Sequence, residues 1–169
     1  MFGRRNIAVL LLVAFSAVGC QEGLPTGPTG PLGVLLSSAP ATLTAVPSTG
    51  VSVMVDGVPV TLAWKVSFSV VMNLDVDHDP VEIVSVANAV QQAVEGVVVI
   101  PTPPGVELFL FDQRPGGNRI EPGGEQVVDF DLWYLLPNGG REALVTITFT
   151  LTADVRGDFA NTISIPVAP

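Results

Sequence analysis

The most regular feature of the chain is an alternation of apolar and polar residues at every second position. It is clearest over 144–153, where Val145, Ile147, Phe149 and Leu151 alternate with four threonines. Because successive side chains of a β-strand point to opposite faces of the sheet, this pattern predicts a strand with one buried and one hydroxyl-bearing face. Threonine and valine also favour strands by their branching at Cβ.

The same alternation runs from Val58 to Met72, where every even-numbered position is apolar. A strand of that length would extend nearly 50 Å at about 3.3 Å per residue, so we expect a bend or bulge near Pro59 or Ala63. A shorter valine-rich segment precedes it, and Asp56-Gly57 lies between the two. That dipeptide is typical of a tight turn, so the pattern predicts a β-hairpin.

Further strand-like segments are separated by clusters of proline and glycine, which are turn-forming residues. Residues 81–96 are also mainly strand-like, although 87–95 would suit a short helix. Strands and turns at this spacing, without a long helical pattern, predict an all-β fold built as an antiparallel β-sandwich. The other predicted strands are 106–111, 127–136 and 162–167, and the turn clusters are 101–105, 115–117, 122–124 and 137–140.

The last third of the chain combines a Pro-Gly-Gly turn at 122–124, the strand-like segments 127–130, 144–154 and 161–167, and Gly157 between the last two. This arrangement resembles the closing strands of bacterial immunoglobulin-like or fibronectin-III-like modules. The resemblance covers about 45 residues and implies an immunoglobulin-like sandwich. The cysteine pair of antibody domains is absent, and the resemblance implies a fold rather than a function.

The first 20 residues differ in composition from the rest of the chain. Arg4 and Arg5 precede an apolar run over 7–18, and the small residues of 17–19 follow. This is the pattern of an export signal, and the run is shorter than the roughly 20 residues that a membrane-spanning helix needs. We therefore expect residues 1–19 to be a cleaved signal peptide.

The residues Ala17-Val18-Gly19-Cys20 resemble the lipobox of bacterial lipoproteins. The resemblance implies that Cys20, the only cysteine of the chain, is acylated and becomes the first residue of the mature protein. It also implies lipid anchoring in the bacterial cell envelope, and Gln21 favours the outer membrane if the source has one. Ala17 stands where the family usually has leucine, so cleavage by ordinary signal peptidase stays open.

Residues 20–47 are rich in proline and glycine and predict a flexible tether after the anchor, with the sandwich domain over 48–169. As an alternative, Val34-Leu35-Leu36 would form a short first strand. Without Arg4 and Arg5 the chain keeps five basic residues against 16 acidic ones, a formal net charge of −11. This charge argues against nucleic acid as a partner and against a protein face lying on anionic lipid.

Asp75, Asp77 and Asp79 have the alternate spacing of carboxylates in calcium-binding loops. An EF-hand is excluded, because Pro80 stands where that loop needs glycine and Val86 where it needs the bidentate glutamate. A looser calcium site at the edge of the sandwich is left as a hypothesis, against which a solvated acidic turn is favoured. No other cofactor is expected.

Catalytic chemistry has few residues to use, since the chain has one histidine, one lysine and one tyrosine. A serine triad would need His78 and lacks a nucleophile elbow. Asp129 and Asp131 would suit glycoside hydrolysis, although alternate positions of a strand usually form a solvent-facing polar edge. Arg156-Gly157-Asp158 matches an adhesion tripeptide and is interpreted as a turn. We expect the protein not to be an enzyme.

The function expected from these features is that of a non-enzymatic envelope lipoprotein whose sandwich serves as a structural or protein-interaction module. Its partners would be the membrane, through the lipid anchor, and another protein. The alternative is a ligand-binding module for carbohydrate or calcium. Exposed aromatic rings would mark a carbohydrate site, and Trp133, on the strand face opposite Phe130 and Tyr134, is the residue to examine.

Overall fold

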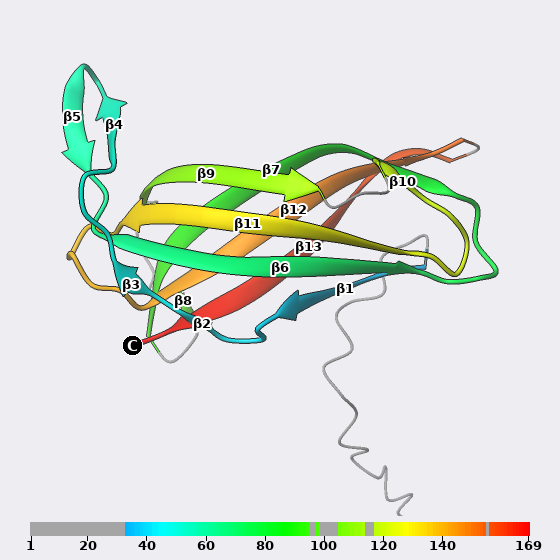
Figure 1. The fold of residues 1–169 in the computed structure, drawn as a ribbon, viewed down its shortest axis with the longest axis horizontal. Coiled ribbons are helices and arrows are strands. Elements are labelled where there is room, and N and C mark those ends of the chain that lie inside the picture. The colour runs from blue at the N-terminus through cyan, green and yellow to red at the C-terminus, as the bar shows by residue number, and fades with distance from the viewer. Residues whose placement is uncertain (1–32, 95–96, 99–104, 114–116, 155) are drawn as a thin grey trace, which may run out of the picture.

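The computed structural model describes residues 33–94, 97–98, 105–113, 117–154 and 156–169. Within these ranges every regular element is a β-strand. The strands form two layers that pack face to face, which confirms the predicted all-β sandwich (Figure 1). Among the described residues there is no helix with the length and apolar character to cross a membrane.

The first sheet has the strand order β1-β6-β11-β9, and all of its pairings are antiparallel. In the register of this sheet, Phe68 on β6 lies opposite Phe130 on β11, which in turn lies opposite Phe111 on β9. The short strand β3 also pairs with β6. The strands are β1 (Val34–Ala39), β3 (Val46–Pro47), β6 (Trp64–Leu74), β9 (Val106–Gln113) and β11 (Glu125–Leu135).

The second sheet has the strand order β10-β7-β12-β13-β2. Its long strands are antiparallel, whereas the two-residue strand β2 runs parallel to β13. The two-residue strand β8 pairs with β7. The strands are β2 (Leu43–Thr44), β7 (Val81–Val94), β8 (Val97–Val98), β10 (Arg119–Ile120), β12 (Ala143–Ala153) and β13 (Gly157–Ala168).

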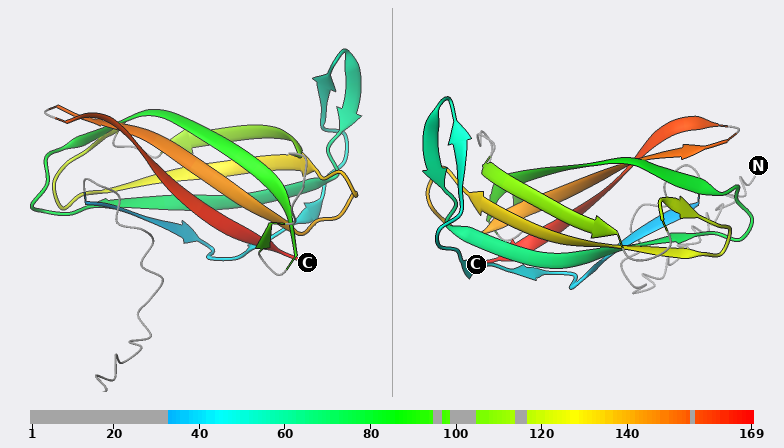
Figure 2. Two further views of the ribbon diagram at one scale, coloured as in Figure 1. Left: turned by 180° about the vertical axis from the view of Figure 1, so that it is seen from behind. Right: turned by 45° about the horizontal axis from the view of Figure 1, so that its top comes forward.

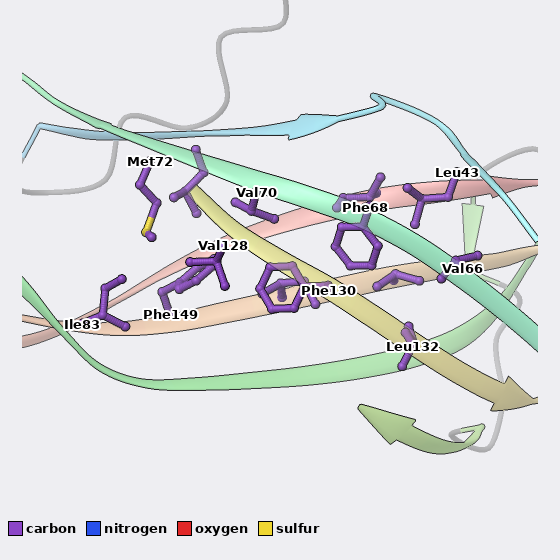
Figure 3. Packing of buried hydrophobic residues seen from close by; sticks show 14 of the residues in the cluster. Leu43, Val66, Phe68, Val70, Met72, Ile83, Val128, Phe130, Leu132 and Phe149 are labelled. Carbon is purple, nitrogen blue, oxygen red and sulfur yellow. The ribbon is translucent and has the colours of Figure 1, made fainter. Parts of the chain in front are cut away.

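The core lies between the two sheets and is built from the alternate apolar residues of β6, β11 and β12 (Figure 3). Phe130 is at its centre: its ring stacks on Phe68, with 5.1 Å between centroids, and meets the edge of Phe149 at 6.2 Å. The threonines of β12 lie on the opposite face, where Thr148 and Thr162 hydroxyls are 3.1 Å apart. The period-two pattern therefore assigned the buried face of β12 correctly.

The predicted hairpin is present as β4 (Ser52–Val55) and β5 (Val58–Thr61), joined by Asp56 and Gly57. Both turn residues have positive φ, 49° and 80°, which is the conformation that a two-residue hairpin turn requires. The predicted interruption near Ala63 is also found, because β5 ends at Thr61 and β6 begins at Trp64.

One expectation for this region is wrong: the buried face does not continue from β6 into β5. The β4–β5 hairpin forms a separate two-stranded sheet that stands off one end of the sandwich (Figures 1 and 2). Val58 is 61% exposed, whereas Leu62 is fully buried where the chain enters the sandwich. The alternation is unbroken through the bend, so the pattern alone does not reveal where the strand leaves the core.

The predicted tether over 20–47 is also too long. Residues 34–39 form β1, an edge strand in which Leu36 lies opposite Met72 of β6, and Val34, Leu36 and Leu43 are buried in the core. The alternative of a short first strand at Val34-Leu35-Leu36 is confirmed. The part of the predicted tether before Gly33 lies outside the described residues.

The ambiguous segment 81–96 is a strand as far as Val94, and its last two residues lie outside the described ranges. The register between β7 and β12 shifts at Thr150 and Leu151, which pair with Ser85 and Ile83. Val84 is the extra residue of this bulge and is exposed. The bulge explains why the apolar residues of β7 do not follow a strict alternation.

Candidate functional site

The outer face of the first sheet carries a row of polar side chains, which we call the outer polar row: Ser67, Ser69, Asp112, Asp129 and Asp131. They come from β6, β9 and β11, and strand register brings them together. Ser67 donates a hydrogen bond to Asp131 and Ser69 donates one to Asp129, each over 2.5 Å. Together with Ala39, Leu110 and the adjoining phenylalanines they line a shallow depression of about 550 Å³.

Asp131 has a second partner at this site. The Lys65 ammonium lies 2.9 Å from its carboxylate. The hydrogen bond from Ser67, with the charge of Lys65 beside it, holds the pKa of the Asp131 carboxyl below its usual range. A general acid for glycoside hydrolysis needs a raised pKa, so the environment of Asp131 is opposite to the one that this hypothesis requires.

Trp133 lies on the same outer face, opposite Lys65, as its strand parity predicted. The Lys65 ammonium is placed over the indole ring at 4.6 Å from its centroid. The Trp133 side chain is half-buried, and the Lys65 ammonium already covers one face of its ring. A sugar that stacked on that face would have to displace Lys65, so the structure does not favour Trp133 as a carbohydrate platform.

Tyr134 and Trp64 point the other way, into the sandwich. Tyr134 is buried and its hydroxyl donates a hydrogen bond to the carbonyl oxygen of Arg141 in the loop between β11 and β12. The indole N–H of Trp64 donates to the carbonyl oxygen of Gly139 in the same loop, over 3.2 Å. These two aromatic residues hold the loop at this end of the sandwich and are not surface platforms.

The acidic turn at 75–79 connects β6 to β7, and Asp75, Asp77 and Asp79 are all exposed. The backbone N–H of Asp77 points at the Asp75 carboxylate over 3.4 Å. In the described part of the chain there is no group of three His, Cys, Asp or Glu side chains that could hold a metal ion. The convergence of carboxylates that the calcium hypothesis needs is thus not found in this turn.

His78 packs beneath the start of β1. A Cβ atom added to Gly33 would come within 2.6 Å of the imidazole Nδ1, which explains a glycine at this position. The small hollow beside His78 is lined by Asp77, Asp79, Ala153 and Arg156 and by no serine, so the described residues give a serine triad no nucleophile here. Arg156 and Gly157 lie where the chain turns from β12 to β13, and Gly157 has φ of 74°.

Glu107 is a feature that sequence reasoning missed. It lies on β9 opposite Tyr134, on the inward face, where it meets Asn88 of the second sheet. Burial raises the pKa of the Glu107 carboxyl to about 7, although the polar groups of Asn88 and of the Val90 backbone nearby oppose the shift. The signal was present in the sequence, because Glu107 shares a strand face with Phe109 and Phe111.

The chain was compared with known protein families and with curated proteins. No protein-family model matches the chain, and no curated protein matches it. Cys20 and the predicted signal peptide lie outside the described residues, so cleavage and lipidation stay predictions from the sequence.

Proposed function

We propose that the protein is a non-enzymatic lipoprotein of the bacterial cell envelope, anchored through Cys20, whose immunoglobulin-like sandwich presents a binding surface to another protein. The observation that carries this proposal is the β4–β5 hairpin. It projects from the sandwich, and Met54 and Val58 on it are large apolar side chains that are mainly exposed.

The hairpin has one wholly apolar side and one mixed side, on which Ser52 pairs with Thr61. Val53 pairs with Val60 and Val55 with Val58, so one side consists of valines, while Met54 lies beside Pro59 on the other. Met54 is 67% exposed. A two-stranded hairpin is marginally stable in water by itself, and covering its apolar side chains with a partner stabilises it. This is the behaviour expected of a docking element.

The position of the hairpin favours a protein partner over the membrane. Val34, the first residue of β1, pairs with Leu74 at one end of β6, and the hairpin joins β6 at Trp64, the other end. At roughly 3.3 Å per residue these ends are about 33 Å apart. The described domain therefore begins at the end opposite the hairpin, and the formal net charge of −11 without Arg4 and Arg5 opposes contact with anionic lipid.

The strand order supports the immunoglobulin-like part of the proposal. The immunoglobulin constant-type fold places strands A, B, E and D in one sheet and C, F and G in the other. The order β1-β6-β11-β9 matches A-B-E-D, and the order β7-β12-β13 matches C-F-G. The seven strands also follow one another along the chain as A to G do. The short parallel pairing of β2 with β13 adds a further strand to the second sheet.

Site-directed photo-crosslinking in cells tests the hairpin. A photoreactive residue in place of Met54 should give one dominant protein adduct, and one in place of Ser164, on the exposed face of β13, should not. Val58→Lys should reduce the adduct at position 54 by roughly tenfold, since burying a valine contributes about 1.5–3 kcal/mol. Equal adducts at both positions, or an adduct that Val58→Lys leaves unchanged, would contradict the proposal.

Metabolic labelling with a radioactive fatty acid tests the anchor separately. The wild-type chain should incorporate label and move to the membrane fraction, and Cys20→Ala should do neither. Label in both chains, or in neither, would reject acylation at Cys20 and favour release by ordinary signal peptidase.

A further inference from the structure

The strand β9 is an edge of the first sheet, and five of its eight residues are apolar. Among the described residues it pairs only with β11. Its sequence from Val106 to Gln113 is VELFLFDQ, and Leu110 is 53% exposed. An edge strand offers its unpaired N–H and C=O groups to any other extended chain, and proteins usually protect such edges with charges, proline or a covering segment.

The two ends of β9 differ in how they meet the second sheet. At the beginning, the N–H of Gly105 donates to the carbonyl oxygen of Val90 on β7, and Glu107 meets Asn88. At the other end Phe111 faces inward, with its ring 6.2 Å from that of Phe130, yet it is 46% exposed. Among the described residues, those of the second sheet therefore cover the core at the start of β9, whereas Phe111 at the other end is partly exposed.

The exposed face next to this opening is acidic. Asp112 lies directly opposite Asp129, and Asp131, which is ion-paired with Lys65, follows two residues along β11. Asp112 is exposed, so its carboxylate is accessible to a basic side chain of a neighbouring strand. Without Arg4 and Arg5 the chain carries a formal net charge of −11, so two β9 edges from two copies would bring like charges together.

We propose that residues 108–113 of β9 bind an extended segment of another protein by strand addition, and that this segment alternates apolar with lysine or arginine residues. Main-chain hydrogen bonds to the edge provide affinity, and the alternation provides specificity. The apolar side chains of the segment cover Phe111, and its basic side chains lie beside Asp112 on the outer face. Glu107, turned inward near β7, limits pairing to the later part of the strand.

Hydrogen exchange with two synthetic peptides tests this inference. The full chain, purified in detergent with its own anchor, is mixed with an acetylated (Val-Lys)₄ peptide or with the matched (Val-Glu)₄ peptide. The basic peptide should slow amide exchange in 108–113 and leave the other edge strand, β1, unchanged. The proposal would be overturned if the acidic peptide protected 108–113 equally, or if the basic peptide protected another segment instead. It would also be overturned if protection of 108–113 rose with protein concentration before any peptide was added.

Charge reversal identifies the residues involved. Asp112→Lys should weaken binding of the basic peptide by roughly threefold to tenfold, since an exposed charge pair contributes up to about 1 kcal/mol and reversal adds repulsion. Asp158→Lys makes the same charge change at an exposed position of β13 and should alter binding less than twofold. An equal effect of the two substitutions would show attraction to net charge alone and reject this site.

Peptide binding at β9 can be distinguished from partner binding at the β4–β5 hairpin. Val58→Lys lies on β5, outside the first sheet, and should leave peptide protection at β9 unchanged. Peptide binding that Val58→Lys removes would place the binding surface at the hairpin and not at β9.

Discussion

Glu107 gives the structure a pH dependence that can be measured. Its carboxyl is inward-facing on β9, and desolvation raises its pKa from 4.5 to about 7. In the folded protein the carboxyl therefore holds a proton at pH values where it is ionised in the unfolded chain. The free energy of unfolding should fall as the pH rises from about 4.5 to 7, and this contribution should be constant above that range.

The magnitude follows from the size of the shift. One pKa unit corresponds to about 1.36 kcal/mol, so the full shift sets an upper limit of about 3.4 kcal/mol. Because the side chain is only half-buried and keeps some contact with water, we expect about 1–2 kcal/mol between pH 5 and pH 8. Glu107→Gln removes the ionisation while keeping the shape of the side chain, so it should be more stable than the wild type at pH 8.

Urea unfolding at pH 5 and pH 8 gives the free energy of unfolding of the wild type and of Glu107→Gln. The difference between the two proteins at each pH isolates Glu107, because the other ionisable groups are the same in both. Glu125→Gln, at an exposed position of β11, is the matched control for the loss of one glutamate. If the wild type and Glu107→Gln lose the same free energy between the two pH values, the carboxyl is not desolvated as described.

Three further predictions concern the core, the domain boundary and calcium. Phe149→Ala should cost about 3–5 kcal/mol in chemical unfolding, and Thr148→Ala on the opposite face less than about 1 kcal/mol, since only Phe149 is fully buried; equal losses would reject the assigned face. A chain over 33–169 should melt cooperatively by circular dichroism, whereas one over 48–169 should be unfolded or strongly destabilised, because it lacks β1; equal stability would show that β1 is dispensable. Calcium should change the melting temperature little, and a large shift that Asp77→Ala abolishes would revive the calcium site.

The strands and turns of this protein were predictable because their signals are local. Alternation in 144–153 places Phe149 inward and Thr148 outward, whatever strand lies beside them. Asp56-Gly57 adopts the positive φ values that its residues favour. These features depend on neighbouring residues alone, so a single sequence contains them.

The candidate surfaces were decided by tertiary structure, because they depend on which strands are neighbours. No local pattern shows that Leu36 pairs with Met72 and thus extends the domain towards the N-terminus. The unbroken alternation of β5 and β6 hides the point where the hairpin leaves the core. Likewise, the local pattern of VELFLFDQ predicts a strand but not its place in the sheet. Among the described residues this strand pairs with β11 and with no other strand, which makes it an edge and leaves Phe111 partly exposed.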